Sequence, residues 1–282
     1  MKIITSIGEL QQTVDNERIS KRRIALVPTM GFLHDGHASL IRKARQETDV
    51  VITSIFVNPT QFAPNEDFSR YPRDLERDMM IAEEAGCDII FAPTAEEMYP
   101  EGFKTSVKVG IVSEKFDGVF RPIHFEGVAT VVLKLFLAAK PHRAYFGQKD
   151  YQQTLVIRKL VRDLNLDVQI DIVPTRREAD GLAMSSRNVY LSEENRAHAL
   201  KLFKALKTGE EVFLKGEKER VKINAAMRAV LQEIPDAVID YAAAAKAADF
   251  DEPDFFKSGD DIVLLIAVRI GNTRLIDNMI IP

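Results

Sequence analysis

Short, nearly continuous apolar runs alternate along the chain with longer stretches in which apolar residues recur at helical spacing. The apolar runs end in turn residues and are typical of strands buried on both faces of a parallel sheet; they cover residues 23–29, 49–58, 87–93, 143–147 and 167–175. The stretches between them predict helices within residues 36–48, 72–86 and 150–166, and a strongly apolar helix within 127–142. Alternating strands and helices predict an α/β fold with a doubly wound parallel sheet. Residues 105–118 fit either a hairpin or an irregular insertion.

The pattern changes after residue 188. Two polar–apolar helical stretches, 193–214 and 217–233, precede a strand-like run over 237–245 and two further strands within 261–282 that join at Gly271–Thr273. We therefore predict a Rossmann-like domain over residues 1–187 and a smaller C-terminal α+β domain over residues 188–282.

Composition narrows the class of ligand. The 282 residues include 38 basic and 42 acidic side chains spread along the whole length, for a formal net charge of -4. Without a basic stripe, neither nucleic acid nor a membrane surface is an expected partner. Cys87 is the only cysteine, which excludes an internal disulfide framework. The balanced charge instead favours a small ligand. The polar N-terminus and the absence of a long apolar run predict a soluble, cytoplasmic protein.

The predicted fold indicates where that ligand binds. In an open parallel sheet, ligands lie outside the carboxyl ends of the strands, so the loops that follow the strands carry the site. Polar residues gather in these loops, in the stretches TMGFLHDGH, NPTQF, GQKDYQQ and READGLAMSSRN. We expect these four clusters to supply the functional side chains.

The first loop combines two glycines with two histidines. Gly31 and Gly36 allow tight turns, and a helix that begins near His37 offers free N–H groups to an anion, so His34 and His37 can donate to phosphoryl oxygens. Two alternatives stay open: one histidine caps the helix while the other packs, or the two form a zinc site with His124 and Asp35.

The later loops carry positive charge and hydroxyl groups. Lys149 can neutralise phosphate charge in a transition state, and Asp150 can accept ribose hydroxyls, although a solvated charge pair at a helix start is the ordinary alternative. The loop with Ser185, Ser186 and Arg187 suits a triphosphate, although such residues also make ordinary polar turns.

Three neutral amides complete the set: Asn58, Gln61 and Gln153 suit a small substrate with hydroxyl and carboxylate groups. The chain has neither the Rossmann fingerprint G-x-G-x-x-G nor the Walker A loop G-x-x-x-x-G-K-[ST]. Any bound phosphate groups must therefore be held by other residues.

Two motifs resemble those of a known superfamily. HDGH is similar to the HIGH signature of nucleotidylyltransferases, and MSSRN is similar to the counterpart of their KMSKS loop. The blocks PTMGFLHDGH, SIFVNPTQF, RPIHFEGVATVV, FGQKDYQQ and READGLAMSSRN together resemble the pantoate–β-alanine ligase family over essentially the whole chain. This resemblance implies ATP-dependent condensation of pantoate with β-alanine through a pantoyl-adenylate, with release of AMP and pyrophosphate. It also implies dependence on Mg²⁺ and a homodimer. We expect residues 1–187 to bind nucleotide and pantoate, and residues 188–282 to act as a lid, because the mixed anhydride must be shielded from water.

The resemblance also implies roles for single residues. The expected catalytic residues are His34, His37, Lys149, Ser185, Ser186 and Arg187. The expected ATP contacts are Met30, Gly36, His37, Gly147, Lys149, Asp150, Arg176, Ser185, Ser186 and Arg187. Asn58, Gln61 and Gln153 fall on pantoate positions, Asp78 is a candidate metal ligand, and Arg121 and His124 lie in a flanking block.

Two positions depart from the family pattern. Ile123 stands where the family commonly has glycine, which questions the local loop conformation, and Arg176 stands where an aliphatic residue is usual near the adenine. The open functional alternatives are a related nucleotidylyltransferase with another small substrate and a His-based metallohydrolase. The amides Asn58, Gln61 and Gln153 distinguish pantoate from other small substrates of the same phosphate chemistry.

Overall fold

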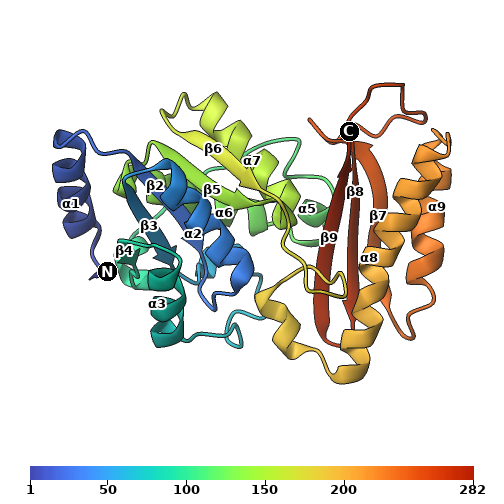
Figure 1. Cartoon of the computed structure of the whole chain (residues 1–282), viewed down its shortest axis with the longest axis horizontal. Coiled ribbons are helices and arrows are strands. Elements are labelled where there is room, and N and C mark those ends of the chain that lie inside the picture. Colours follow the sequence, from blue (N-terminus) through green and yellow to red (C-terminus); the bar gives the residue numbers. More distant parts are fainter. The chain divides into compact units, whose positions relative to one another are not determined.

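A computed structural model describes all 282 residues and contains two sheets (Figure 1). Six parallel strands form the larger sheet in the order β1-β4-β3-β2-β5-β6, and three antiparallel strands form the smaller one in the order β7-β8-β9. The predicted α/β class with a doubly wound parallel sheet and an α+β C-terminal part is confirmed. The strands are β1 (Lys2–Ile4), β2 (Ile24–Thr29), β3 (Val50–Ile55), β4 (Ile89–Phe91), β5 (Arg143–Gly147), β6 (Gln169–Val173), β7 (Val238–Lys246), β8 (Ile262–Ile270) and β9 (Thr273–Ile281).

The chain divides into two compact units. Unit 1 comprises Met1–Glu114, Arg121–Gln148 and Gln152–Pro174, whereas unit 2 comprises Lys115–Phe120, Lys149–Tyr151 and Thr175–Pro282. Two short segments that precede residue 175, Lys115–Phe120 and Lys149–Tyr151, thus belong to unit 2. The functional boundary after residue 187 stays a prediction.

Helices cover both faces of the six-stranded sheet. Successive strand residues point to opposite faces, so Leu26 lies in one core and its neighbour Val27 in the other. Helices α1, α6 and α7 pack on the Leu26 face, and α2 and α3 pack on the Val27 face. The helices of unit 1 are α1 (Ile7–Ile19), α2 (Asp35–Glu47), α3 (Leu75–Glu84), α4 (Ala95–Met98), α6 (His124–Ala139) and α7 (Tyr151–Asp163, whose first residue belongs to unit 2), with the 3₁₀ turns η1 (Pro59–Gln61) and η2 (Gln148–Asp150), which ends in unit 2.

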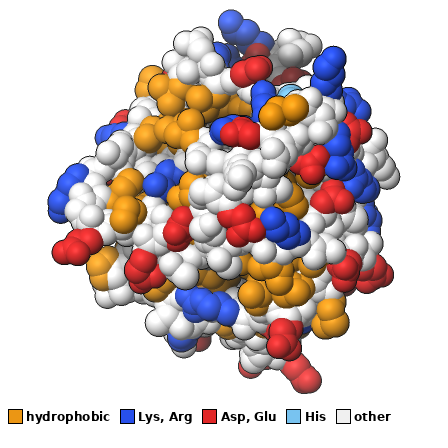
Figure 2. Space-filling model, turned by 90° about the vertical axis from the view of Figure 1, so that its left-hand side faces the viewer, with side chains coloured by type: hydrophobic (Ala, Val, Ile, Leu, Met, Phe, Trp, Pro, Cys, Tyr) orange, Lys and Arg blue, Asp and Glu red, His pale blue; other side chains and the backbone are white.

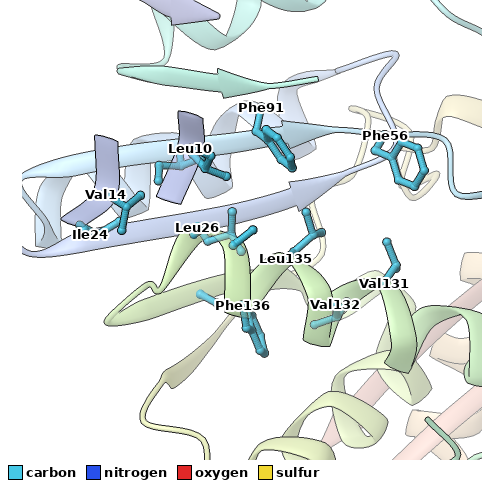
Figure 3. Close-up of a cluster of buried hydrophobic side chains, with 14 of the residues drawn as sticks. Leu10, Val14, Ile24, Leu26, Phe56, Phe91, Val131, Val132, Leu135 and Phe136 are labelled. Carbon is cyan, nitrogen blue, oxygen red and sulfur yellow. The ribbon is translucent and has the colours of Figure 1, made fainter. Parts of the chain in front are cut away.

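Figure 3 shows the core on the α1/α6 face. Leu26 and Phe91 of the sheet meet Leu135 and Phe136 of α6, and Leu10 of α1 covers the same cluster. All five side chains are at least 95% buried. This layer packs α6 against the strands and so fixes the amino end of α6, where candidate site residues lie.

The sequence pattern failed at the edges of the sheet. Strand β6 was expected to be buried on both faces, but this is wrong: residues 169–173 are exposed or half-buried, because β6 is an edge strand with a single neighbour. Neither β1 nor α1 was predicted, since a three-residue strand gives no period and α1 buries only Leu10 and Val14. Residues 105–118 form no hairpin; the alternative, an irregular segment, is correct, and it leads into the short helix α5 (Asp117–Phe120) of unit 2.

The order of strands places a topological switch point between β2 and β5. The chain moves from β2 to β3 and β4 on one side of the sheet, then returns to β5 and β6 on the other. Strand β2 pairs with β3 along its whole length, up to Thr29 opposite Ile55, but with β5 only at Ala25 and Leu26. The carboxyl halves of β2 and β5 therefore separate, which is the geometry that opens a ligand crevice in this type of sheet.

In unit 2, helices α8 (Glu193–Leu214) and α9 (Arg220–Leu231) pack on one face of the antiparallel sheet. The predicted hairpin is confirmed: β8 and β9 join through Gly271 and Asn272, and Gly271 takes the left-handed φ of 55° that such a turn requires. The residues of β8 from Ile262 to Val268 are buried without interruption, as the apolar run indicated. The remaining 3₁₀ turn is η3 (Ser186–Tyr190).

The surface agrees with the balanced composition. On the face shown in Figure 2, acidic and basic side chains are interspersed, and neither sign forms a continuous field. None of the helices combines the length and the apolar character needed to span a membrane.

Candidate active site

The loop after β2 turns sharply before α2 begins. Gly31 has a φ of 83°, and a side chain there would meet the Asp78 carboxylate at 2.9 Å, so glycine is required on both grounds. Phe32 also has a positive φ, of 49°. The strained turn is held by Asp78, whose two carboxylate oxygens accept the N–H groups of Phe32 at 2.8 Å and of Leu33 at 2.6 Å.

Both histidines cap helix α2. His34 is the N-cap residue, and its Nδ1 accepts the Gly36 N–H at 3.2 Å, while Nδ1 of His37 accepts the His34 N–H at 3.3 Å. Because both Nδ1 atoms are acceptors, each neutral ring carries its proton on Nε2. The rings lie 4.1 Å apart between centroids. Capping and phosphate contact are therefore compatible, because the cap uses Nδ1 of each ring and a contact with phosphate would use Nε2–H.

Asp78 has a structural task in the turn after β2, because it accepts the N–H groups of Phe32 and Leu33. The side chain is buried, and burial raises its pKa although the N–H groups of Leu33 and Phe32 oppose that effect. The chain contains no group of three or more His, Cys, Asp or Glu side chains arranged to hold a metal ion. His34, His37, His124 and Asp35 therefore do not form the cluster that a metallohydrolase requires, and the role of Asp78 as a metal ligand stays a prediction.

The amide pair after β3 is organised by the chain itself. Asn58 is 1% exposed and donates from Nδ2 to Gln61 Oε1 at 3.0 Å and to the Gly127 carbonyl at 3.2 Å. Its Oδ1 accepts the Tyr99 hydroxyl at 2.7 Å. Burial raises the pKa of Tyr99, so its hydroxyl stays a neutral donor. Asn58 thus sets the orientation of the Gln61 amide, whose Nε2 lies 3.0 Å from Met30 Sδ.

Residues at and near the amino end of α6 contact the main chain at Thr60 and Gln61 and so hold the Asn58–Gln61 pair in place. A side chain at Gly127 would lie 2.5 Å from the Thr60 carbonyl oxygen and 2.6 Å from the Gln61 nitrogen, so only glycine lets α6 approach η1 this closely. His124 Nδ1 donates to the Gln61 carbonyl at 3.0 Å. Arg121 reaches the same carbonyl at 3.4 Å.

Arg121 is itself fixed by Glu66, which accepts from Nε at 2.6 Å and from Nη2 at 2.8 Å. Burial raises the pKa of Glu66, but the hydrogen bonds and charge of Arg121, with smaller contributions from the Ala63 N–H and His124, lower it, and the net direction is downward. Ile123 precedes α6 with a φ of -96°, which isoleucine adopts without strain. The departure from glycine at this position therefore leaves the loop conformation intact.

Two of the predicted site residues, Gly147 and Gln153, lie at the end of β5 and just after it. Gly147 ends β5, where a side chain would meet no atom within 4 Å, so the backbone is open to close approach by a ligand. Gln153 lies in the first turn of α7 and is half-buried.

Lys149 and Asp150 belong to unit 2 although they follow β5 directly. Lys149 Nζ lies 3.3 Å from Asp150 Oδ1, so the charge pair that the sequence left open as an alternative does exist. The Lys149 side chain is 20% exposed and the Asp150 side chain 48%. An exposed pair of this kind contributes little stability, and it can open when an anion offers Lys149 a better partner.

The segment from Arg176 to Arg187 folds back on itself in unit 2. The Arg176 carbonyl accepts the Met184 N–H at 3.0 Å, and Arg177 pairs with Ala183 as an isolated bridge. Gly181 makes the turn with a φ of 98°, close against the Phe203 ring.

The Ser-Ser-Arg residues follow this turn. The Ser185 Oγ accepts the Arg187 N–H at 3.3 Å and so caps η3, and Ser186 is 7% exposed. The serines thus have local structural tasks as well as hydroxyl groups.

Sequence reasoning missed several supporting residues. Tyr99, Glu66 and Gly127 fix the amide pair, and Asp277 and Asn278 of β9 fix segments of unit 2. Each acts on a residue at least 41 positions away in the chain, so no local motif could have indicated it.

The fold and the histidine-capped helix define a class. At the switch point of the doubly wound sheet, helix α2 begins with a cap in which the Nδ1 atoms of two histidines accept main-chain N–H groups. The chain also lacks both common glycine-rich phosphate loops. These features together are typical of α/β nucleotide-binding enzymes with a HIGH-type corner.

Comparison with known proteins defines the family. The family model described as pantoate-beta-alanine ligase matches residues 2–280. Pantothenate synthetase of Acetivibrio thermocellus is 51% identical over 281 residues, which cover 100% of this chain and 99% of that protein. Pantothenate synthetase of Carboxydothermus hydrogenoformans is 52% identical over 282 residues, again 100% and 99% of the two chains. The chain therefore belongs to the pantoate–β-alanine ligase family.

Solved structures of this family have the same fold as the chain. The crystal structure of pantothenate synthetase from Thermus thermophilus has a TM-score of 0.93 at 46% identity, over 99% of both chains. That of pantoate-beta-alanine ligase from Francisella tularensis, complexed with beta-gamma ATP and beta-alanine, has a TM-score of 0.78 at 35% identity, over 99% of this chain and 97% of that one.

Proposed function

We propose that the chain condenses pantoate with β-alanine in two steps, through a pantoyl-adenylate. The overall reaction, an ATP-dependent condensation to pantothenate, is that of the family to which the chain belongs. The two-step route and the residue roles below go beyond family membership and rest on the chemistry of the side chains.

In the first step, a carboxylate oxygen of pantoate attacks the α-phosphorus of ATP. An O–P bond forms, the bond from the α-phosphorus to the bridging oxygen breaks, and pyrophosphate leaves. The carboxylate is already ionised at neutral pH, so this step needs positioning and charge neutralisation rather than a general base.

Charge develops on the departing pyrophosphate. The Nε2–H groups of His34 and His37 are proposed to donate to phosphoryl oxygens, because both Nδ1 atoms are held by main-chain N–H groups. Lys149 and the loop with Ser185, Ser186 and Arg187 are proposed to supply positive charge and further donors, with Met30, Gly36, Gly147, Asp150 and Arg176 contacting the rest of the nucleotide.

Pantoate is proposed to contact Gln61 and Gln153. A glutamine amide can donate to the carboxylate and accept from a hydroxyl. Asn58 orients Gln61 through the 3.0 Å hydrogen bond between their amides, and its direct contact with pantoate stays part of the proposal.

In the second step, the neutral amine of β-alanine attacks the acyl carbon of the adenylate. A C–N bond forms, the C–O bond to the phosphate breaks, AMP leaves, and the amine proton passes to solvent. The mixed anhydride must be shielded from water, and residues 188–282 are proposed to act as a lid.

The proposal also covers the metal ion, the oligomeric state and the location of the enzyme. Mg²⁺ is proposed to enter as the MgATP substrate, because the chain offers no cluster of three acidic or histidine ligands and Mg²⁺ commonly binds through substrate phosphates. The enzyme is proposed to be a cytoplasmic homodimer.

The histidine-capped corner at the amino end of α2, where both Nδ1 atoms accept main-chain N–H groups, carries the adenylation proposal. ATP–pyrophosphate exchange tests it: exchange should require Mg²⁺ and pantoate but not β-alanine. Exchange that is equally fast without pantoate would contradict the substrate assignment. Exchange supported by another small acid, but not by pantoate, would favour a related nucleotidylyltransferase.

A further inference from the structure

The main chain at Lys149 is held by residues far along the sequence. The Asn278 side-chain Nδ2 donates to the Lys149 carbonyl at 2.8 Å, and the Tyr151 hydroxyl donates to the Ala247 carbonyl at 2.7 Å. Asn278 lies in β9, and Ala247 directly follows β7. These contacts attach the lysine segment to unit 2, whereas the chain before and after it belongs to unit 1.

Asn278 is well placed to act as a fixed anchor. It is 2% exposed, and it pairs with Leu265 across the β8–β9 ladder. Its own N–H donates to the Asp277 carboxylate at 2.8 Å, and its carbonyl accepts from Arg177 Nη2 at 3.3 Å. A buried amide fixed at its main chain in this way has little freedom to follow a displaced partner.

Asp277, the residue before Asn278 in β9, anchors the segment from Arg176 to Arg187, which is proposed to contact phosphate. Asp277 is buried and accepts a forked pair of hydrogen bonds from Arg177, at 2.6 and 2.9 Å. Arg177 also donates to the Gly181 carbonyl at 3.1 Å, so it fixes the base and the turn of the segment from Arg176 to Arg187. Adjacent residues of one strand therefore set both segments to which phosphate contacts are assigned.

We propose that Asn278 is a positioning residue for Lys149: its amide fixes the Lys149 carbonyl so that the ammonium group meets phosphate charge at the correct place. The proposal rests on the proposed function, in which Lys149 stabilises the transition state of adenylation. A charge aimed at a transition state loses effect when it is displaced by a fraction of a hydrogen-bond length, because catalysis depends on preorganised geometry.

The Asn278→Asp variant tests the contact with little change of shape. An ionised aspartate has no N–H donor, and its oxygen would face the Lys149 carbonyl oxygen. We expect the single-turnover rate of pantoyl-adenylate formation, at saturating ATP and pantoate, to fall on the order of 10-fold, a factor equivalent to one lost hydrogen bond to a buried group.

A double-mutant cycle with Lys149→Ala separates positioning from general damage. If Asn278 acts through Lys149, the Asn278→Asp change should slow the Lys149→Ala enzyme by less than about 2-fold, because no ammonium group is left to misplace. Independent, multiplicative losses in the double variant would overturn the proposal, as would an unchanged rate in Asn278→Asp alone.

Asn224 provides the matched control. Its side chain also bonds the main chain of unit 2, but it accepts the N–H of Ala244 in β7, at 2.7 Å, and this hydrogen bond joins α9 to β7 instead of holding the lysine segment. Asn224→Ala should lower the melting temperature without slowing adenylate formation. If Asn278→Asp does not fold, Asn278→Ala enters the same cycle. If Lys149→Ala alone keeps full activity, the proposed role of Lys149 in adenylation is contradicted. This outcome differs from multiplicative losses in the double variant, which contradict only the positioning role of Asn278.

Discussion

Gly127→Ala is expected to disturb both stability and pantoate binding. The added methyl carbon would lie 2.5 Å from the Thr60 carbonyl oxygen, 2.6 Å from the Thr60 carbonyl carbon and 2.6 Å from the Gln61 nitrogen. Favourable contacts between heavy atoms begin near about 3.5 Å, so α6 and η1 must separate by roughly 1 Å. All three obstructing atoms are main chain and cannot rotate away.

The energy can be worked out from these contacts. Overpacking of this kind costs about 3 kcal/mol, and the better helix propensity of alanine offsets about 1 kcal/mol. A net loss of about 2 kcal/mol corresponds to a fall of about 4–8 °C in melting temperature for a domain of this size. The separation also stretches the 3.2 Å hydrogen bond from Asn58 to the Gly127 carbonyl. We therefore expect KM for pantoate to rise about 10-fold, equivalent to one hydrogen bond, with little change in Kd for ATP.

Gly8→Ala is the matched control, because Gly8 also lies in a helix but a side chain there meets nothing within 4 Å. It should stabilise the protein by about 0.5–1 kcal/mol and leave the kinetics unchanged. Thermal unfolding and pantoate kinetics on both variants make the comparison. A Gly127→Ala protein as stable as the wild type, with an unchanged KM, would refute the close approach of α6 to η1.

Three further changes test other parts of the site. Lys149→Ala should slow adenylate formation about 100-fold in a folded protein, the loss expected for one preorganised stabilising group, and an unchanged single-turnover rate would make Lys149 a surface charge. Gln153→Glu would set a carboxylate against the pantoate carboxylate and should lower kcat/KM for pantoate about 100-fold; equal losses in pantoate kinetics and ATP binding, or none in either, would contradict the contact. Glu66→Gln should destabilise the protein by about 1–3 kcal/mol at pH 7, because it leaves Arg121 without its carboxylate. The folded-state pKa of Glu66 lies below its usual 4.5, so this stabilisation is present above that pH and is lost as the pH falls through the folded pKa. Urea unfolding over a series of pH values from 7 downward should therefore show a constant difference above pH 4.5 that shrinks as the pH falls through the folded pKa of Glu66. A difference that stays constant at every acid pH where both proteins fold would contradict the assignment.

The sequence alone determined the features that depend only on residues close together in the chain, such as strands, helices and turns. Apolar runs and helical spacing predicted the central strands and most helices, and the strand–helix alternation then predicted the sheet edge where polar loops gather. The stretch TMGFLHDGH identified the histidine corner, because turn glycines, a helix start and its capping residues are close in the chain. The two-residue turn at Gly271 was equally local.

Only the tertiary structure decided how those residues are supported. Asp78 closes on the turn at Phe32 from 46 positions away, and Asn278 bonds the Lys149 carbonyl from 129 positions away. A carboxylate or an amide looks the same in a sequence whether it meets solvent, a ligand or a distant main-chain group, because the partner is chosen by packing. The edge position of β6 shows the same limit, since its apolar run fits a central strand and only the order of the strands exposes it. Local chemistry therefore indicated which groups are candidates for the reaction, and long-range packing fixed how their main-chain segments are held.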